Sequence, residues 1–167
     1  MNKLMIAFVI VIIDQFSKLM IKFNLISASP KDILGDFLRF TYIENPGLAF
    51  GVSVGSFGWL LFIVTVLITL YIIYYIFSDM TLVRGEMLSL NFILGGAIGN
   101  LIDRTFTLFN LFDYRGVIDF IDIGLSNFYR WPYIFNIADM SVTVGIIIFI
   151  FSSYLYSNQN NINNETA

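Results

Sequence analysis

Long runs of apolar residues alternate with shorter polar segments along this chain, and their lengths predict helices that cross a membrane. A helix needs about 20 mostly apolar residues to span a hydrocarbon core of about 30 Å. The clearest run is Phe57–Phe77, which contains no charged residue. Met87–Ile102 is also uncharged but short, so this helix must extend through Asp103 and Arg104 or begin near Arg84.

Two further runs carry polar residues inside them. The first extends from Leu4 to about Phe23 and the last from about Trp131 to Tyr156. Their polar members include Asp14, Lys18, Lys22, Asn136 and Asp139. No small-residue cleavage site follows the first run, so we expect it to be retained rather than removed as a signal peptide. The fold class predicted is an all-α integral membrane protein with four transmembrane helices in one domain, residues 1–156, followed by a polar tail, residues 157–167.

Two longer connections contain residues that favour β-structure. Phe37–Tyr42 is a β-prone aromatic run, followed by a turn signal at Asn45–Gly47 and then by Ala49–Val54. Val117–Ile123 is a second β-prone run, and the Trp131-Pro132 pair after it is typical of an interfacial anchor and a helix start. We therefore expect a small hairpin or sheet at the membrane surface.

The composition supports a membrane protein and narrows the possible chemistry. Hydrophobic residues make up 57% of the chain and charged residues 13%, against about 45–50% and 25% in soluble domains. There is no cysteine and no histidine, which excludes disulfides, Ser-His-Asp triads and zinc sites built on Cys or His. The net charge of -3 gives no reason to expect a nucleic-acid partner. Any catalysis must use carboxylates, lysine or serine.

Polar residues in the predicted helices share faces on one side of the membrane. With four spans, both longer connections and the helix ends that adjoin them lie on that side. One face of the third predicted helix carries Gly96, Asn100, Asp103 and Arg104, and one face of the fourth carries Asn136, Asp139 and Thr143. The first predicted helix carries Asp14 and Lys18 one turn apart. Ionisable groups within a membrane usually face the bundle interior and indicate a functional site.

Several of these residues also have a purely structural interpretation. Asp14 and Lys18 are spaced for an i,i+4 ion pair, and the Gly95 and Gly99 spacing favours close helix packing. Asn100 and Arg104 suit an interhelical hydrogen bond and an interfacial charge, and Asp103 suits the headgroup region. Asp119 and Asp122 lie in a connection, and their positions alone do not choose between them. Asp139, about two turns inside its predicted span, needs a partner, which favours function.

Two carboxylates in one site can hydrolyse a peptide bond, because one holds a proton while the other acts as a base. The ionised carboxylate takes a proton from water, the neutral one donates to the carbonyl oxygen, and nearby Asn or Arg side chains stabilise the developing charge. A Ser17–Lys18 dyad is less favourable, since adjacent residues on a helix point about 100° apart.

Five motifs in the chain resemble those of bacterial lipoprotein signal peptidase, also called signal peptidase II. They are Asp14–Lys18, Asn45–Phe50, Gly95–Arg104, Val117–Ile121 and Phe135–Asp139. They occur in the order of that family and cover almost the whole chain. The departures are Ser17, where Thr is usual, and Leu48, where a small residue is common.

The resemblance implies an intramembrane aspartic endopeptidase with Asp119 and Asp139 as its catalytic pair. Its substrates would be diacylglyceryl-modified prolipoproteins, cut just before the lipidated cysteine. The residues implied to bind substrate are Asn45, Gly47, Asn100, Arg104 and Asn136. The polar residues implied to support the fold are Asp14, Lys18 and Asp103. Further implications are membrane lipids as partners, inhibition by globomycin-like cyclic lipopeptides, no metal or organic cofactor, an extracytoplasmic β-rich cradle and a monomer.

Orientation and the rival functions complete these expectations. Only Lys3 and Arg84 lie on the side of the termini, so a simple count of basic residues would invert the protein. The resemblance instead implies cytoplasmic termini and a site near the extracytoplasmic face of the bacterial cell membrane. The alternatives are a small transporter or ion-relay subunit using Asp14 and Asp139, and a non-catalytic assembly factor. Against the transporter, the chain has no internal repeat, and its polar residues gather at one side of the membrane.

Overall fold

Four helices make up most of the chain. The computed structural model describes residues 3–26, 29–47, 58–79, 81–126 and 129–165. The helices are α1 (Met5–Leu25), α2 (Gly58–Ser78), α3 (Arg84–Leu108) and α4 (Ile137–Glu165). Within the described residues, three segments are long and apolar enough to cross a membrane: Trp59–Ser78, Arg84–Leu108 and Ile137–Tyr156. The chain is therefore a mostly helical, multi-pass membrane protein.

The first three helices follow the hydrophobic pattern closely. Helix α2 starts and ends within one residue of its predicted limits. Helix α3 both begins at Arg84 and continues beyond Arg104, so the two extensions proposed for it occur together. Helix α1 is 21 residues long but is not among the three apolar segments. It carries Asp14, Lys18 and Lys22 on its buried face.

The predicted start of the fourth helix is wrong. The backbone from Trp131 to Phe135 stays beside the sheet, since the N–H of Trp131 donates to the carbonyl of Ile123 at 2.7 Å and that of Phe135 to Ile121 at 3.2 Å. These contacts to Val117–Ser126 outcompete the helix-start signal of Trp131-Pro132. Helix α4 begins only at Ile137 and continues to Glu165, so the backbone of the polar C-terminal segment is helical over residues 157–165.

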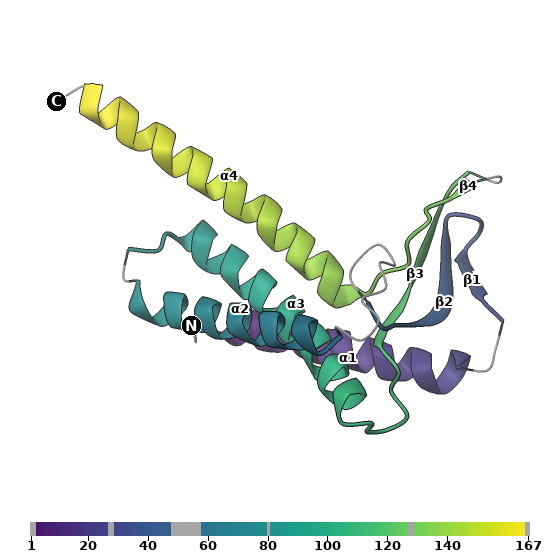
Figure 1. Cartoon of the computed structure of the whole chain (residues 1–167). Helices are drawn as coiled ribbons and strands as arrows, with labels where there is room; N and C mark the ends of the chain where they lie inside the picture. The colour runs from purple at the N-terminus through teal and green to yellow at the C-terminus, as the bar shows by residue number, and fades with distance from the viewer. Residues whose placement is uncertain (1–2, 27–28, 48–57, 80, 127–128, 166–167) are drawn as a thin grey trace.

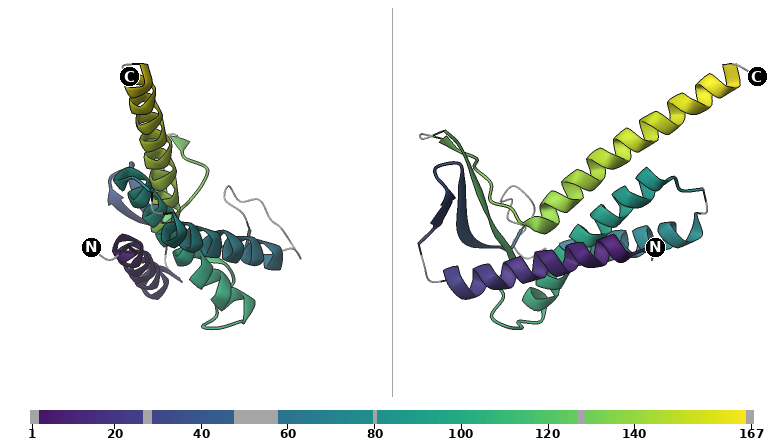
Figure 2. Two further views of the ribbon diagram at one scale, coloured as in Figure 1. Left: turned by 90° about the vertical axis from the view of Figure 1, so that its left-hand side faces the viewer. Right: turned by 180° about the vertical axis from the view of Figure 1, so that it is seen from behind.

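Helix α3 lies at the centre and contacts each of the other three helices (Figure 1, Figure 2). Its small residues permit this close approach. A side chain at Gly95 would meet Ile10 of α1 at 2.8 Å, and one at Gly96 would meet the carbonyl oxygen of Ala138 in α4. Gly99 is likewise pressed against α1. The close packing predicted from the Gly95 and Gly99 spacing is therefore present.

A four-stranded antiparallel sheet lies at one end of the helices (Figure 1). Its strands, in spatial and chain order, are β1 (Lys31–Leu34), β2 (Leu38–Asn45), β3 (Val117–Ser126) and β4 (Tyr129–Arg130). The expected sheet is present, and its two β-prone runs pair with each other as β2 and β3. Ala49–Val54, the other expected strand segment, lies outside the described residues.

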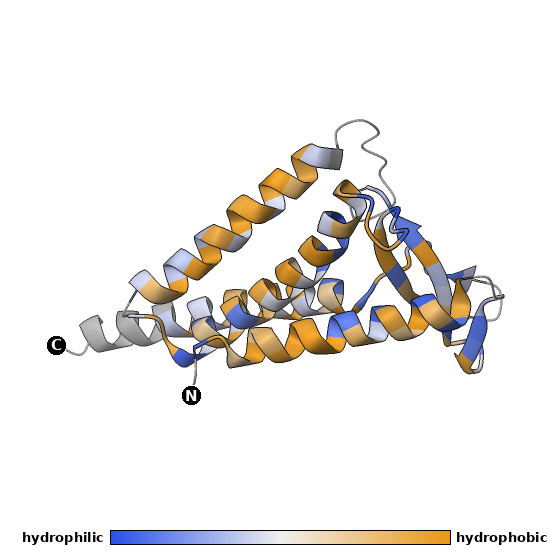
Figure 3. Cartoon of the chain, turned by 90° about the horizontal axis from the view of Figure 1, so that it is seen from below, coloured by the Kyte–Doolittle hydropathy of each residue, from blue (hydrophilic) through white to orange (hydrophobic). Residues whose placement is uncertain are grey.

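Two apolar clusters hold the elements together. One joins the end of α1 to the sheet and contains Ile21, Leu25, Tyr114, Ile118, Phe120 and Ile121. The other joins α1, α2 and α3 at the opposite end and contains Ala7, Ile72, Ile76, Leu90 and Leu94. Many large apolar side chains on the outer helix faces stay exposed, such as Phe8, Leu67 and Phe151. Figure 3 shows hydrophobic residues along the helices and more hydrophilic residues in the sheet, as expected for helices facing lipid.

Candidate active site

Strand β3 presents two aspartates to opposite faces of the sheet. Asp119 and Asp122 are three positions apart, and successive side chains of a strand alternate between faces. Asp119 is 4% exposed and accepts hydrogen bonds from the side-chain amides of Asn45 at 3.0 Å and Asn136 at 2.6 Å. Asp119 is therefore held between β2 and the start of α4.

Asp122 has a different environment. It forms an ion pair with Arg130, Nε to Oδ1 at 2.8 Å, and accepts a hydrogen bond from Thr41 Oγ1 at 3.0 Å. These contacts connect β3 to β4 and to β2. Asp122 thus stabilises the pairing of β3 with its two neighbouring strands.

Asp139 belongs to a capping box at the start of α4. The side-chain oxygen of Asn136 accepts from the backbone N–H of Asp139 at 2.9 Å, and Asp139 Oδ2 accepts from the backbone N–H of Asn136 at 3.2 Å. This reciprocal pair satisfies two of the N–H groups that a helix leaves free at its start. Asp139 is the third residue of α4, so the expectation that it lies two turns inside a span is wrong.

Two asparagines join the aspartates into one network. Asn136 caps α4 with its oxygen while its Nδ2 donates to Asp119. Asn100 of α3 donates from Nδ2 to Asp139 Oδ1 at 2.8 Å, and its oxygen accepts from Asn136 Nδ2 at 3.2 Å. Asn136 is fully buried. Asn136 is one of the residues expected to bind substrate. In the structure it contacts both aspartates.

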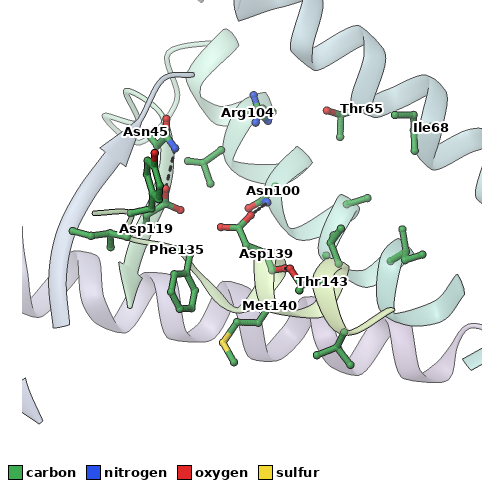
Figure 4. Close-up of a pocket in the computed structure, with 18 of the residues that line it drawn as sticks. Asn45, Thr65, Ile68, Asn100, Arg104, Asp119, Phe135, Asp139, Met140 and Thr143 are labelled. Atoms are coloured by element: carbon green, nitrogen blue, oxygen red, sulfur yellow. Dashed lines mark hydrogen bonds between the residues drawn. The ribbon is translucent and has the colours of Figure 1, made fainter. Parts of the chain in front are cut away.

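The two aspartates face a cavity of about 750 Å³. Figure 4 shows their carboxylates directed toward one another, with Asn100 and Arg104 of α3 beside them. Asn45, Asn100, Arg104, Asp119 and Asp139 all line this cavity. Its remaining wall is largely apolar and comes from α2, α3, α4 and the segment before α4, including Ile68, Ile93, Trp131, Phe135 and Val142.

Arg104 brings hydrogen-bond donors into this cavity. Its Nη2 donates to the carbonyl oxygen of Gly47 at 3.4 Å, a long contact. Its Nε is buried and has no hydrogen-bond partner among the described residues. A buried N–H without an acceptor is costly, so a substrate oxygen that reached Nε would be bound favourably. Gly47 itself is buried beside this guanidinium.

The electrostatics favour a protonated Asp119. Burial, followed by the negative charge of Asp139, raises the pKa of Asp119 to about 7, while the hydrogen bonds from Asn45 and Asn136 act in the opposite direction. A carboxyl with this pKa retains its proton in a substantial fraction of molecules near neutral pH. It can therefore serve as an acid.

The three residues expected to support the fold form a separate buried cluster. The ammonium of Lys18 contacts Asp14 Oδ2 at 2.8 Å and Asp103 Oδ2 at 3.0 Å, with all three side chains fully buried. Asp103 also contacts the sheet, because its Oδ2 accepts the N–H of Ile118 at 3.0 Å. Sequence reasoning missed Gln15, whose Nε2 donates to Asp14, Asp103 and the Gly99 carbonyl. Its place between two of the predicted residues was the available signal.

A membrane bundle whose two aspartates face one apolar cavity has the arrangement of an intramembrane aspartic peptidase. Comparison with known proteins agrees. The family model described as signal peptidase (SPase) II matches residues 6–155. The chain therefore belongs to the signal peptidase II family.

Individual relatives are similar over most of their length. A lipoprotein signal peptidase of Clostridium novyi is 40% identical over 83% of this chain and 87% of its own. One of Moorella thermoacetica is 40% identical over 87% of both chains. A bacterial membrane enzyme structure determined by the in meso method at 2.3 Å resolution superposes with a TM-score of 0.78, at 30% identity, over 96% of this chain and 90% of that one.

Proposed function

We propose that this protein removes the signal peptide from prolipoproteins with Asp119 and Asp139 as its catalytic pair. Family membership and the relatives named lipoprotein signal peptidase support the reaction. The observation that carries the residue assignment is the placement of both carboxylates on one cavity, each hydrogen-bonded to Asn136. No other side chain is needed to supply or accept a proton.

The two carboxylates have different roles. Asp139 lies in the first turn of α4, where the helix dipole favours negative charge, and it receives hydrogen bonds from Asn100 Nδ2 and the Asn136 backbone N–H. Asp139 is therefore the ionised member and the general base. Asp119, whose pKa is raised to about 7, is the proton donor.

Hydrolysis then follows from these roles. Water lies between the carboxylates, Asp139 takes its proton, and the oxygen attacks the scissile carbonyl carbon. Asp119 donates its proton to the carbonyl oxygen, which gives a neutral tetrahedral diol. When the C–N bond breaks, Asp139 returns a proton to the leaving nitrogen and Asp119 recovers one from the diol, so both regain their starting states.

The other cavity residues hold the peptide during these steps. The guanidinium of Arg104, which lines the cavity, supplies donors for a peptide carbonyl. The Asn45 side chain fixes Asp119 at 3.0 Å, and Gly47 fixes the guanidinium of Arg104. We infer that Asn45, Gly47, Asn100 and Arg104 form the substrate-binding wall, with Asn136 behind them.

The substrate is inferred to carry diacylglycerol on the cysteine that follows the cut. The apolar wall of the cavity suits an apolar signal peptide, while acyl chains remaining in the bilayer anchor the cysteine, at about 0.8 kcal/mol for each buried CH₂. Lipid attachment then places the scissile bond beside the aspartates. Globomycin-like cyclic lipopeptides are expected to inhibit by occupying the same cavity, and the enzyme is expected to act as a monomer.

Incubation of the purified protein with matched precursors tests this function. One precursor carries the diacylglyceryl cysteine, and the other has the same sequence without lipid, in the same detergent. The lipidated precursor should be cut just before its cysteine and the unlipidated one poorly or not at all. Comparable rates for the two would refute the lipid requirement, and no cleavage of either would refute the function.

We also infer four transmembrane helices, with α1 as the fourth, and a site near the extracytoplasmic face of the bacterial cell membrane. The first turn of α1 and the end of α4 both lie on the side of the molecule away from the sheet (Figure 1), which supports an even number of spans. Two basic residues of the sheet end are engaged in ion pairs, Arg39 with Asp32 and Arg130 with Asp122. Their charges are therefore partly balanced, which weakens the argument from the count of basic residues. A cysteine introduced at Asn110 should react with an impermeant thiol reagent outside intact cells, and one at Ser78 should not.

The transporter alternative is less favourable. It required Asp14 and Asp139 to act together as ion-binding groups. Asp14 does not line the cavity and is fully buried in its ion pair with Lys18. Its second oxygen accepts the backbone N–H of Ala138 at 2.8 Å. Asp14 is therefore held in buried contacts away from the cavity that Asp139 lines.

A further inference from the structure

Lys18 joins the buried cluster of α1 to the catalytic network. Its side chain is fully buried. The ammonium contacts Asp14 Oδ2 at 2.8 Å, Asp103 Oδ2 at 3.0 Å and Asn100 Oδ1 at 3.0 Å. A lysine ammonium has three N–H donors, so these three acceptors match its full capacity. Two of the acceptors are carboxylates, and the third is the amide that also contacts Asp139.

The ammonium determines which way the Asn100 amide faces. A lysine ammonium can only donate, so the atom of Asn100 that faces it must be the oxygen. Asn136 Nδ2 donates to the same oxygen at 3.2 Å. The Nδ2 of Asn100 is thereby directed to Asp139 Oδ1 at 2.8 Å. The reversed amide would place its N–H₂ against the ammonium and its oxygen against the carboxylate, which are two repulsive contacts.

We propose that Lys18 is a positioning residue for the reaction, acting on Asp139 through Asn100. This inference rests on the proposed function, because it requires Asp139 to be the general base. Lys18 does not line the cavity and so does not touch the substrate. Its role is to keep the Asn100 N–H directed at the base while the substrate is bound and cleaved.

A purely structural Lys18 would behave differently when replaced. Loss of a buried ion pair would lower the fraction of folded protein but leave the turnover of each folded molecule intact. A positioning Lys18 changes the turnover of folded molecules and leaves the binding wall in place. The two roles are separated by measuring kcat and KM per folded molecule, with folded protein quantified by thermal unfolding in detergent.

Lys22 is a matched control on the same helix. It lies one turn further along α1, is largely buried, and pairs with Glu44 at 3.3 Å. Its ammonium also lies 3.8 Å from the centre of the Tyr114 ring. Lys22→Met therefore removes a buried lysine from an ion pair without removing a donor from Asn100.

The test uses a lipidated precursor peptide and the variants Lys18→Met, Asn100→Ala, their double variant and Lys22→Met. Lys18→Met should lower kcat by about tenfold or more, with KM changed by less than about threefold. The double variant should be no slower than Asn100→Ala within about twofold, because both changes remove the same contact to Asp139. Lys22→Met should keep its kcat.

Three results would overturn the inference. They are an unchanged kcat in folded Lys18→Met, effects of Lys18→Met and Asn100→Ala that multiply in the double variant, and an equal loss of kcat in Lys22→Met. Where Lys18→Met does not fold, Lys18→Met with Asp14→Asn restores the net charge of the cluster, keeps an acceptor for the Ala138 N–H, and takes its place in the same comparison.

Failure of the proposed function gives a different pattern. If Asp119→Asn and Asp139→Asn still cleave the precursor, the catalytic pair is wrong whatever Lys18 does. If those two variants are inactive while folded Lys18→Met keeps its kcat, the catalytic pair stands and the positioning role of Lys18 is refuted.

Discussion

Two groups of aspartates lie close together in this protein but have opposite surroundings. Asp14 and Asp103 share the ammonium of Lys18, and neither lines the cavity. Asp119 and Asp139 do line the cavity, and the hydrogen bonds described for them come from neutral amides and a backbone N–H. In the first group two carboxylates share one cation, whereas in the second burial, followed by the negative charge of Asp139, raises the pKa of Asp119.

Because of this difference, the first group of aspartates is suited to stabilising the fold and the second to catalysis. A buried carboxylate beside a cation keeps a fixed charge state and holds helices together, at the cost of desolvation. A buried carboxylate beside another carboxylate can exchange a proton near neutral pH, which catalysis requires. Asn100 contacts both groups, through Lys18 on one side and Asp139 on the other.

The largest expected effect is on the reactive pair. Asp139→Asn should lower cleavage by about 10²–10⁴-fold, because an amide cannot take the proton of water. The change keeps the shape of the side chain, so the protein should still fold, and thermal unfolding checks that it does. Asp79→Asn, after the end of α2, is the control and should remain active. A fully active Asp139→Asn would contradict the catalytic role of this pair, and with it the distinction between a structural group and a reactive one.

The next effect is on the stability of the group that shares Lys18. Asp103→Ala should lower the free energy of unfolding by about 3 kcal/mol, because it leaves the Ile118 N–H without its acceptor and removes a partner of Lys18. Chemical unfolding in detergent measures the loss. Asp32→Ala, which breaks the exposed pair with Arg39, should leave the unfolding midpoint unchanged. Equal losses in the two variants would contradict the structural role of the buried group.

A smaller effect concerns pH. The pKa of Asp119 in the folded protein is about 7, above its ordinary value of 3.8, so between these values the folded state binds more protons than the unfolded state. Stability should therefore fall as pH rises through this window, by at most about 1.4 kcal/mol per pH unit from this group. Asp119→Asn removes that dependence.

Unfolding midpoints of wild type and Asp119→Asn, measured from pH 4.5 to 8.5, check this expectation. The variant should gain stability relative to wild type as pH rises, and the gain should shrink toward pH 4.5. A difference that does not change with pH, or that grows toward acid, would show that Asp119 does not hold a proton in the folded protein.

The helices and the family could be predicted from the sequence because their signals are local. Uncharged runs fixed α2 and α3, and the spacing of Gly95 and Gly99 indicated close packing. The start of α4 was missed because hydrogen bonds to β3 hold the backbone in place through Phe135. Pairing between the two β-prone runs is a long-range choice that neither run encodes alone.

The sequence indicated which residues belong to the candidate site better than it indicated which of them contact one another. Asn136 and Asp139 have the spacing of a capping box, but a helix that seemed to begin at Trp131 concealed it. The alternation of strand side chains shows that Asp119 and Asp122 face opposite ways, but not which one faces a cavity. The Lys18 contact to Asn100 joins residues 82 positions apart, and only the packing of α1 on α3 creates it.

The most direct test compares Asp119→Asn with Asp122→Asn in cleavage of a lipidated precursor by purified, folded protein. Both changes replace a buried carboxylate of the same strand by an amide, but Asp119 faces the cavity and Asp122 pairs with Arg130 in the sheet. Asp119→Asn should lose cleavage, while Asp122→Asn should keep most of it. An active Asp119→Asn together with an inactive Asp122→Asn would contradict the assignment of the catalytic pair.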